Sequence, residues 1–276
     1  MRERFGLTKS RSCRLTGLSR SAMYYPPRPQ PEEAALKKRM KDLAEGHRRW
    51  GLPMIHVVLQ REQLVVNHKR SERIYRELGL SLTIRRHKKR AAATRLELPQ
   101  ATRPNERWSM DFMQDALSSG RRFRVLTVID TFTRECPVIE VDSSLTGERV
   151  SRVLDWLALT RGVPEAITVD NGPEFAGKAM DLWAYKRNVK LDFIRPGKPT
   201  ENGYIESFNA TVRRDCLKQH YFTSLEEAKR RIEDWRLEYN GFRPHSSLDG
   251  LTPEAFASKH QQSTGASTQK LYELPV

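Results

Sequence analysis

The chain of 276 residues carries 49 Lys and Arg against 34 Asp and Glu, so its net charge is +15 and its pI is about 10.0. No apolar run approaches the roughly 18 residues of a membrane-spanning helix, and three widely spaced cysteines without a CxxC pair argue against a zinc finger or a disulfide framework. Together with an N-terminus that lacks the apolar stretch of a secretory signal, this composition predicts a protein of a reducing, cytoplasmic compartment.

The positive charge is concentrated in residues 1–104, which hold 25 Lys and Arg against 9 Asp and Glu, whereas the remainder holds 24 against 25. A positive field confined to one part of a chain is typical of a surface that binds a polyanion, most often nucleic acid. A membrane surface is the weaker interpretation, because no basic amphipathic helix with Trp or Phe anchors lies there. A charge run can also be only a solubilising face.

Short helices dominate the first 90 residues. Residues 1–30 are expected to form a short helical segment that is broken at Gly17 and ended by two prolines. Residues 31–90 are expected to form a separate module, because they carry three short amphipathic patterns joined by tight turns. The predicted helices run over residues 32–46, 53–62 and 68–78. Asn67 can cap the third helix, and Gly79 can end it.

The third of these helices is basic. We expect it to bury Ile74 and Leu78 and to leave four cations facing outward, namely Lys69, Arg70, Arg73 and Arg76. Short helices with tight turns and a basic last helix are typical of a helix-turn-helix-like module that binds DNA. The alternative is a small helical bundle with a solvated basic face.

Residues 91–104 are expected to form a basic linker that follows a run of cations at the end of the module. No hydrophobic period surrounds this run, and five of the six residues from 85 to 90 are basic: Arg85, Arg86, Lys88, Lys89 and Arg90. Such a run is predicted to lie along a phosphate backbone.

After residue 104 the sequence changes to apolar, β-branched and aromatic runs. Three consecutive runs within residues 106–143 predict an antiparallel meander of strands. The elements expected after them are a helix at 145–162, a strand at 166–170, a helix at 173–189 and a strand at 191–196. This order predicts an α/β fold with a mixed five-stranded sheet over residues 105–257. The polar residues 258–276 are expected to form a flexible tail.

Two aspartates stand where an ordinary surface role explains them poorly. Asp111 lies inside the apolar strand run WSMDFM, where a charge costs free energy unless it is paired or bound to metal. Asp170 closes the run AITV, at the carboxyl end of a predicted strand, where α/β sheets tend to bind ligands. An Asp that forms a turn ahead of Asn171-Gly172 is an equally good interpretation.

A third acid, Glu206, lies on a predicted helix that begins near residue 202. At about 100° per residue, Asn202, Asn209 and Arg213 all fall within roughly 60° of Glu206 on that helix. An adjacent arc of apolar residues would pack on the sheet. Taken alone, a polar stripe on the protein surface is the simpler interpretation.

Considered together, Asp111, Asp170 and Glu206 can converge if the two strands are neighbours and the helix crosses them. Two unit charges about 4 Å apart repel each other by about 4 kcal/mol at an effective dielectric constant near 20. Divalent cations remove that repulsion, and oxygen ligands suit Mg²⁺ or Mn²⁺. Two such ions form the clamp that enzymes use for in-line phosphoryl displacement.

Several segments resemble one family of proteins. WSMDF, TVDNGPEF, the 35 residues between Asp170 and Glu206, and ESFNATVRRDCL are similar to the DDE transposases of bacterial insertion sequences, of the OrfB type. YNGFRPHSSLDGLTP at 239–253 resembles the C-terminal signature of the same family. The resemblance covers residues 105–256, and residues 32–90 look like the family's N-terminal module. It implies a ribonuclease H-like core similar to that of retroviral integrase.

The resemblance assigns roles to residues of this sequence. It implies that Asp111, Asp170 and Glu206 are the catalytic, metal-binding triad and that Arg213 contacts DNA. The family has Lys-x-Glu where this chain has Arg213-Arg214-Asp215, so the acid is shorter and its ion pairing is in doubt.

Further family positions are expected to support the site. Asp130 is familiar in the family but is not a metal ligand, and Arg134 is expected to pair with it. Asn171 is expected to shape the edge of the active site, together with Gly172, Glu174 and Phe175. Asn202 and Asn209 are expected to hold a strand end or a water molecule.

The function implied is cleavage and strand transfer at insertion-sequence ends with Mg²⁺ or Mn²⁺, two ions being expected. Water would free a 3′-hydroxyl, and this hydroxyl would attack a second phosphodiester without a covalent enzyme–DNA intermediate. The expected partners are double-stranded DNA at transposon ends and target, further copies of the chain on DNA, and an upstream-frame product or fusion. No membrane partner is expected, and the bacterial nucleoid is the expected location.

Two alternatives stay open. A structure-selective nuclease on the same fold would cut DNA but never join it. A DNA-binding regulator or inhibitor of transposition with an inactive core would do neither.

Overall fold

The structure is a computed structural model of the chain, and it describes residues 5–19, 21, 31–82, 100–195 and 202–260. The chain divides into two compact units, residues 1–82 and residues 83–276. The cations expected at 85–90, most of the linker and the tail beyond residue 260 lie outside the described residues. Within the described segments, no helix is long and apolar enough to cross a membrane.

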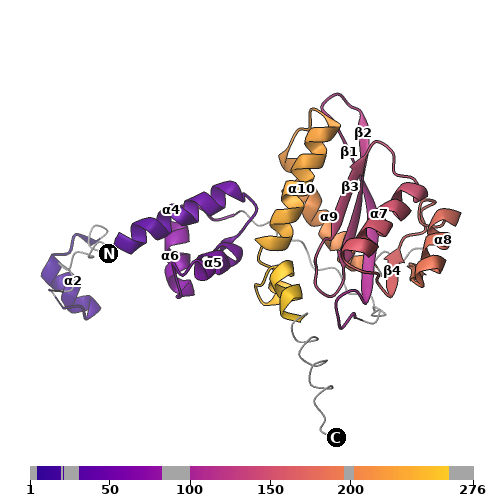
Figure 1. Ribbon diagram of the computed structural model, residues 1–276. Coiled ribbons are helices and arrows are strands. Elements are labelled where there is room, and N and C mark those ends of the chain that lie inside the picture. Colours follow the sequence, from indigo (N-terminus) through magenta and orange to yellow (C-terminus); the bar gives the residue numbers. More distant parts are fainter. Residues whose placement is uncertain (1–4, 20, 22–30, 83–99, 196–201, 261–276) are drawn as a thin grey trace, which may run out of the picture. The chain divides into compact units, whose positions relative to one another are not determined.

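The first unit is built from the short helices that the sequence predicts (Figure 1). They are α2 (Lys9–Thr16), α4 (Pro31–Gly46), α5 (Leu52–Arg61) and α6 (His68–Glu77). Gly17 and Gly79 follow two of these helices with φ angles of 68° and 65°, a left-handed conformation that costs glycine little. The Asn67 side chain accepts a hydrogen bond from the Lys69 amide at 2.9 Å, so it caps α6 as predicted.

The core of the first unit is apolar. The sequence predicts that Leu78 is buried in it, and this prediction is wrong. The fully buried side chains include Leu36, Met40, Ile55, Leu59 and Ile74. Leu78 is only partly buried, whereas Tyr75 joins Ser71 and Ile74 as a buried residue of α6. Leu78 is the C-cap of α6, and the chain turns at Gly79. The Leu78 side chain therefore no longer follows the buried side of the helix.

The second unit contains the predicted mixed five-stranded sheet. Its strands are β1 (Arg107–Ala116), β2 (Arg122–Asp130), β3 (Val138–Asp142), β4 (Ala166–Val169) and β5 (Lys190–Phe193). β1 pairs antiparallel with β2, and β2 with β3, whereas β4 runs parallel to both β1 and β5. The strand order is β3-β2-β1-β4-β5. The meander and the fold class predicted from the sequence are therefore confirmed.

Helices cover both faces of this sheet (Figure 1). On one face lie α7 (Gly147–Thr160) and α8 (Lys178–Arg187), and on the other lie α9 (Gly203–Asp215) and α10 (Leu225–Gly241). Successive side chains of a strand point to opposite faces, so Trp108 and Met110 pack toward α7 and α8, whereas Met113 packs toward α9 and α10. Asp111 therefore belongs to the α9 face.

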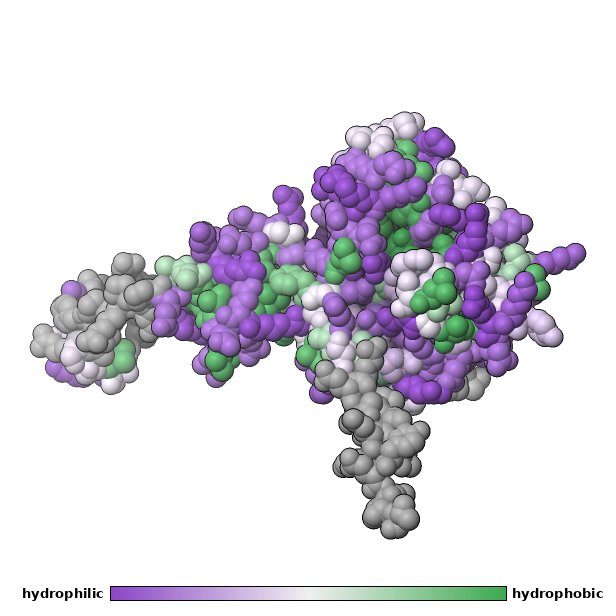
Figure 2. Space-filling model, in the orientation of Figure 1, coloured by the Kyte–Doolittle hydropathy of each residue, from purple (hydrophilic) through white to green (hydrophobic). Residues whose placement is uncertain are grey.

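Two local features complete the unit. α8 begins at Lys178 rather than near residue 173, because the amides of Phe175 and Ala176 donate to the Gly172 carbonyl and form a turn first. At the β3 edge, a hollow of about 370 Å³ between α7 and α10 is lined in part by Val138 and Ile139, and Figure 2 shows a hydrophobic strip there.

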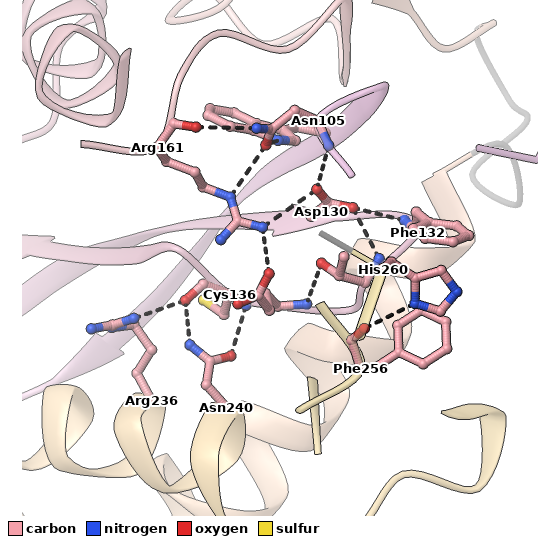
Figure 3. Close-up of polar contacts among 12 residues, drawn as sticks. Asn105, Asp130, Phe132, Cys136, Arg161, Arg236, Asn240, Phe256 and His260 are labelled. Atoms are coloured by element: carbon pink, nitrogen blue, oxygen red, sulfur yellow. Dashed lines mark hydrogen bonds and ion pairs between the residues drawn. The ribbon is translucent and has the colours of Figure 1, made fainter. Parts of the chain in front are cut away.

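Asp130 closes β2 and is fully buried. Its carboxylate accepts hydrogen bonds from the amides of Asn105, Phe132 and Thr133 at 2.8–3.0 Å, and the Arg161 guanidinium lies 3.5 Å away (Figure 3). The expected pair with Arg134 is wrong. The chain turns after Asp130, and the Arg134 guanidinium instead lies over the Tyr204 ring, 3.8 Å from its centroid.

Replacing Asp130 by Ala is expected to lower the free energy of unfolding by about 3–5 kcal/mol, because three backbone amides lose their buried acceptor. Arg161 loses only the weaker of its two acidic partners, because it stays paired with Glu135 at 2.5 Å. Urea unfolding followed by circular dichroism measures this change. The matched substitution of the exposed Asp234 on α10 should stay within about 0.5 kcal/mol. A loss below about 1 kcal/mol at Asp130 would contradict this account of the buried network.

Polar side chains of α10 tie this helix to the segment that follows β2. Asn240 accepts a hydrogen bond from the Cys136 amide at 2.9 Å and donates one to its carbonyl at 2.8 Å, and Arg236 donates to the same carbonyl at 2.9 Å (Figure 3). The three cysteines are buried, and none of them forms a disulfide bond within the described residues. A helix over residues 253–260 follows, and its Phe256 packs on Phe132 with ring centroids 5.4 Å apart.

Candidate active site

The sheet register brings Asp111 and Asp170 together. β1 and β4 run parallel, and Ser109 lies opposite Thr168. Two residues further along each strand, Asp111 of β1 lies beside Asp170, which directly follows β4. Neighbouring strands are about 4.8 Å apart, and residues in register share a face of the sheet. Both carboxylates are therefore directed toward the α9 face.

Asn209 on α9 holds the Asp111 carboxylate in place. Its amide nitrogen donates to Asp111 Oδ2 at 2.8 Å. Its amide oxygen accepts a hydrogen bond from the Thr127 hydroxyl at 2.8 Å, and Thr127 is the β2 residue opposite Asp111. Sequence reasoning missed Thr127, although a single hydroxyl between Leu126 and Val128 in a buried strand was a usable signal. Thr127 of β2, Asn209 of α9 and Asp111 of β1 are thus joined by two consecutive hydrogen bonds.

The three acids share one electrostatic environment. Burial raises the pKa of Asp111, and the negative charges of Asp170 and Glu206 raise it further, while hydrogen bonds from the Phe112 amide and Asn209 oppose the shift. Asp111 and Asp170 are partly buried, whereas Glu206 is exposed one turn before Asn209 on α9. Among the described residues, no three His, Cys, Asp or Glu side chains are gathered closely enough to hold a metal ion. The acids are thus near neighbours and not a closed cage.

A tight turn fixes Asp170. The Gly172 amide donates to Asp170 Oδ1 at 3.0 Å, and Glu174, in the same turn, forms an ion pair with Arg124 on β2. The Asn171 amide nitrogen donates to the Ile194 carbonyl at 2.8 Å. Asn171 therefore ties the ends of β4 and β5 together and makes no bond to the acids.

Gly172 leaves no room for a larger residue. A Cβ atom there would lie 3.0 Å from Asp170 Oδ1 and 3.2 Å from Glu174 Oε2. We expect Gly172→Ala to lower DNA cleavage at least tenfold, because a shift of about 1 Å in a catalytic group can cost about a hundredfold in rate. The control is Gly203→Ala at the start of α9, where a Cβ would meet nothing within 4 Å. Wild-type cleavage by Gly172→Ala would show that the position of Asp170 does not limit the reaction.

Asn202 and Arg213 mark the two ends of α9. Asn202 is buried, and its amide nitrogen lies 3.4 Å from the Met110 carbonyl of β1. Arg213 is exposed two turns beyond Glu206, and its side chain makes no hydrogen bond or ion pair with any described residue. The start of α9 is thus bonded to the sheet, while its end offers an unengaged cation.

Asp215 pairs with two other arginines. Its carboxylate binds Arg214 at 2.6 Å and Arg243 at 2.8 Å. Burial raises the pKa of Asp215, but the two guanidinium groups outweigh burial and hold that pKa below its ordinary value. The ion pairing left in doubt by the shorter acid is thus made with Arg243 of the segment at 239–253, which fastens this segment to α9.

Comparisons with known proteins show the family to which the chain belongs. Two integrase core domain models match residues 101–199 and 187–253, and an HTH-like domain model matches residues 31–89. The IS407 insertion element protein of Burkholderia multivorans, of 31.7 kDa and described as uncharacterized, is 46% identical over 96% of both chains. The chain belongs to the integrase-core transposases of bacterial insertion elements.

Other relatives are consistent with this membership. An IS476 protein of Xanthomonas euvesicatoria, of 39.2 kDa and also described as uncharacterized, is 45% identical over 95% of this chain and 75% of its own. The putative transposase InsK of Escherichia coli IS150 is 27% identical over 87% and 90%. The simian T-cell lymphotropic virus intasome structure superposes with a TM-score of 0.53 at 15% identity, over 70% of this chain and 67% of the viral chain. That superposition shows the shared ribonuclease H-like fold.

In the HTH-like unit of this transposase, two of the residues expected to contact DNA form ion pairs with acids of the same unit. Arg73 forms ion pairs with Glu33 at 2.9 Å and with Glu77 at 2.7 Å, and Arg76 pairs with Glu72. Lys69 and Arg70 lie in the first turn of α6. Exposed ion pairs contribute little stability, and contact of Arg73 and Arg76 with DNA stays a prediction.

Proposed function

We propose that this transposase cleaves DNA at the ends of its insertion element and joins the freed ends to a target, using Asp111, Asp170 and Glu206. The observation that carries the proposal is the partly buried Asp111 carboxylate, which is held by Asn209 and whose pKa is raised by burial and by two further acids. A neutral residue in place of such a charged group would stabilise the fold, so the carboxylate is better explained by a function than by stability.

The donor set fits a divalent metal. Asp111, Asp170 and Glu206 supply only oxygen ligands, which suit Mg²⁺ or Mn²⁺, and a bound cation would relieve the repulsion among their charges. Because Glu206 is exposed, we propose that it approaches the two aspartates when metal and DNA bind. When bound, two such ions would supply Lewis-acid stabilisation of the attacking and leaving oxygens.

The residues of the chain orient the reacting groups in two displacements. In the first, water adds to a phosphorus atom at the element end and the 3′-oxygen leaves. In the second, that 3′-hydroxyl attacks a target phosphodiester, so that one P–O bond forms as another breaks. Asn209 and Thr127 keep the Asp111 carboxylate fixed through both steps, and Arg213 is placed to contact a nearby phosphate. No covalent enzyme–DNA intermediate is required.

The partners in this proposal are double-stranded DNA at element ends and target, and further copies of the chain assembled on that DNA. An upstream-frame product would supply a further recognition domain. The net charge of +16 in residues 1–104 and the HTH-like match at 31–89 support the first of these partners.

The test is an assay with labelled end DNA, an unlabelled target and Mg²⁺. We expect both shortened ends and longer, joined products, and we expect a metal chelator to abolish both and added Mn²⁺ to restore them. Shortened ends without any joined product would assign the chain to the nucleases, and joining in the presence of chelator would contradict the metal requirement.

A further inference from the structure

The far end of α9 opens on a hollow of about 650 Å³. One wall is the turn between β1 and β2, and the other is the segment 217–222 that follows α9. A hydrogen bond of 2.8 Å from the Ser118 amide to the Phe222 carbonyl joins the two walls. Leu217 and Phe222 line the hollow and belong to the buried core. The hollow is therefore a fixed part of the fold.

Three unengaged side chains line this hollow, which we call the α9 groove. Arg213, Lys218 and Tyr221 make no side-chain hydrogen bond or ion pair with any described residue, and Tyr221 is 92% exposed. The neighbouring Arg214, by contrast, is paired with Asp215. The cations of the groove are thus not used to stabilise the fold, and an aromatic ring stands beside them in solvent.

Two further groups complete the lining. Asp115 adds one negative charge, and its carboxylate accepts a hydrogen bond from the Ala116 amide at 2.8 Å. His220 has its Nδ1 bonded to the Cys216 carbonyl at 2.9 Å. Cations outnumber the acid in the groove, which favours an anionic occupant.

We infer that the α9 groove holds an unpaired nucleotide of the element-end strand, with its base stacked on Tyr221 and its flanking phosphates at Arg213 and Lys218. This inference rests on the proposed function. Cations that follow a backbone, together with an aromatic ring that stacks on a base, are the combination by which proteins bind single-stranded nucleic acid. A tyrosine can stack in this way only on a base that has left the duplex.

The position of the groove favours the end strand. Arg213 lies seven residues beyond Glu206 on α9, which is about 10 Å along the helix axis. At about 3.4 Å per nucleotide of one strand, this corresponds to about three nucleotides from the reacting phosphodiester. The end strand must stay bound through both displacements, whereas the target is needed only for the second. A subsite at this distance would keep the cleaved end in place.

The experiment measures binding of full-length protein to end DNA whose last four base pairs are either complementary or mismatched. Tyr221→Ala is expected to weaken binding of the mismatched end about 5- to 150-fold, the range found when a stacking aromatic is removed. Tyr221→Phe keeps the ring and should bind within twofold of wild type. The matched control is Tyr185→Ala on α8, because Tyr185 is also 87% exposed; it should change nothing.

Two further measurements are independent of catalysis. With 2-aminopurine placed at each of the last six positions of the end strand, quenching by wild type should peak near the third nucleotide and disappear in Tyr221→Ala. Lys218→Ala should reduce the slope of log affinity against log salt by about one, the loss of one phosphate contact, whereas Lys186→Ala on α8 should not.

The possible outcomes separate this inference from the proposed function. If wild type joins DNA but Tyr221→Ala binds mismatched ends within twofold and quenching is unchanged, the groove assignment is wrong and the function stands. If Tyr221→Ala weakens only the binding of target duplex, the assignment to the end strand is wrong. If wild type joins no DNA under any metal condition, the proposed function fails, whatever the groove binds.

Discussion

Replacing Asp111, Asp170 or Glu206 by its amide is expected to lower strand transfer at least about 10³-fold. Each substitution preserves shape and removes one negative charge from the proposed metal site. A bound metal ion stabilises charge in the transition state by several kcal/mol, and each 1.36 kcal/mol corresponds to about a tenfold change in rate. Strand transfer of labelled end DNA, measured as initial rate with Mg²⁺, gives the result directly.

Asp111→Asn should separate activity from stability. Burial and the charges of Asp170 and Glu206 raise the pKa of Asp111 in the folded protein, so its ionised form at pH 7 destabilises the fold relative to the unfolded chain. A neutral Asn escapes this penalty, although its one amide oxygen can accept only one of the two hydrogen bonds that the carboxylate accepts from the Phe112 amide and from Asn209. With metal chelated, the melting temperature of Asp111→Asn should therefore equal or exceed that of wild type.

The matched control is Asp181→Asn, which changes an exposed acid on α8 and should leave both properties unchanged. Wild-type strand transfer by any one of the three amide variants would remove that residue from the site. A large fall in the melting temperature of Asp111→Asn would show instead that its carboxylate stabilises the fold.

Replacing the five cations Arg85, Arg86, Lys88, Lys89 and Arg90 by Gln is expected to flatten the salt dependence of DNA binding. Each phosphate contact contributes about 0.9 to the slope of log affinity against log salt, so the slope should fall by up to about 4.5. Between 50 and 200 mM salt, this difference amounts to about 500-fold in the affinity lost by wild type relative to the variant. Fluorescence anisotropy with labelled end DNA at four salt concentrations measures both slopes.

A control variant that neutralises an equal number of exposed cations on α8 and α10 should keep the wild-type slope, because residues 105–276 hold 24 Lys and Arg against 25 Asp and Glu. An unchanged slope in the 85–90 variant, or a larger effect in the control, would move the main phosphate contacts into the catalytic core.

The sequence was sufficient for what depends on local patterns. Alternating and helical periodicity predicted the meander, the later helices and the sheet, because side-chain burial repeats with a fixed period in each element. It also predicted that Asp111 and Asp170 could lie close together. Each acid can be recognised from its neighbours in the sequence, one as a charge within an apolar strand and the other as an acid at the end of a strand.

Contacts that join distant segments were not predictable in this way. Asp130 was paired with Arg134 by proximity in the sequence, whereas Arg161, Asn105 and backbone amides surround it in the fold. Neither the bond from Thr127 to Asn209 nor that from Arg243 to Asp215 follows from spacing. These pairs depend on strand register and helix packing, and both are fixed only when the whole core assembles.

The central claim is that three carboxylates from β1, the end of β4 and α9 bind the catalytic metal. Its most direct test is a crystal structure with Mn²⁺ and end DNA, in which anomalous scattering locates the metal. We predict at least one ion about 2.0–2.3 Å from oxygens of Asp111 and Asp170, with Glu206 binding the same ion or a second one beside it. Manganese bound elsewhere, or held by only one of the three acids, would contradict the account.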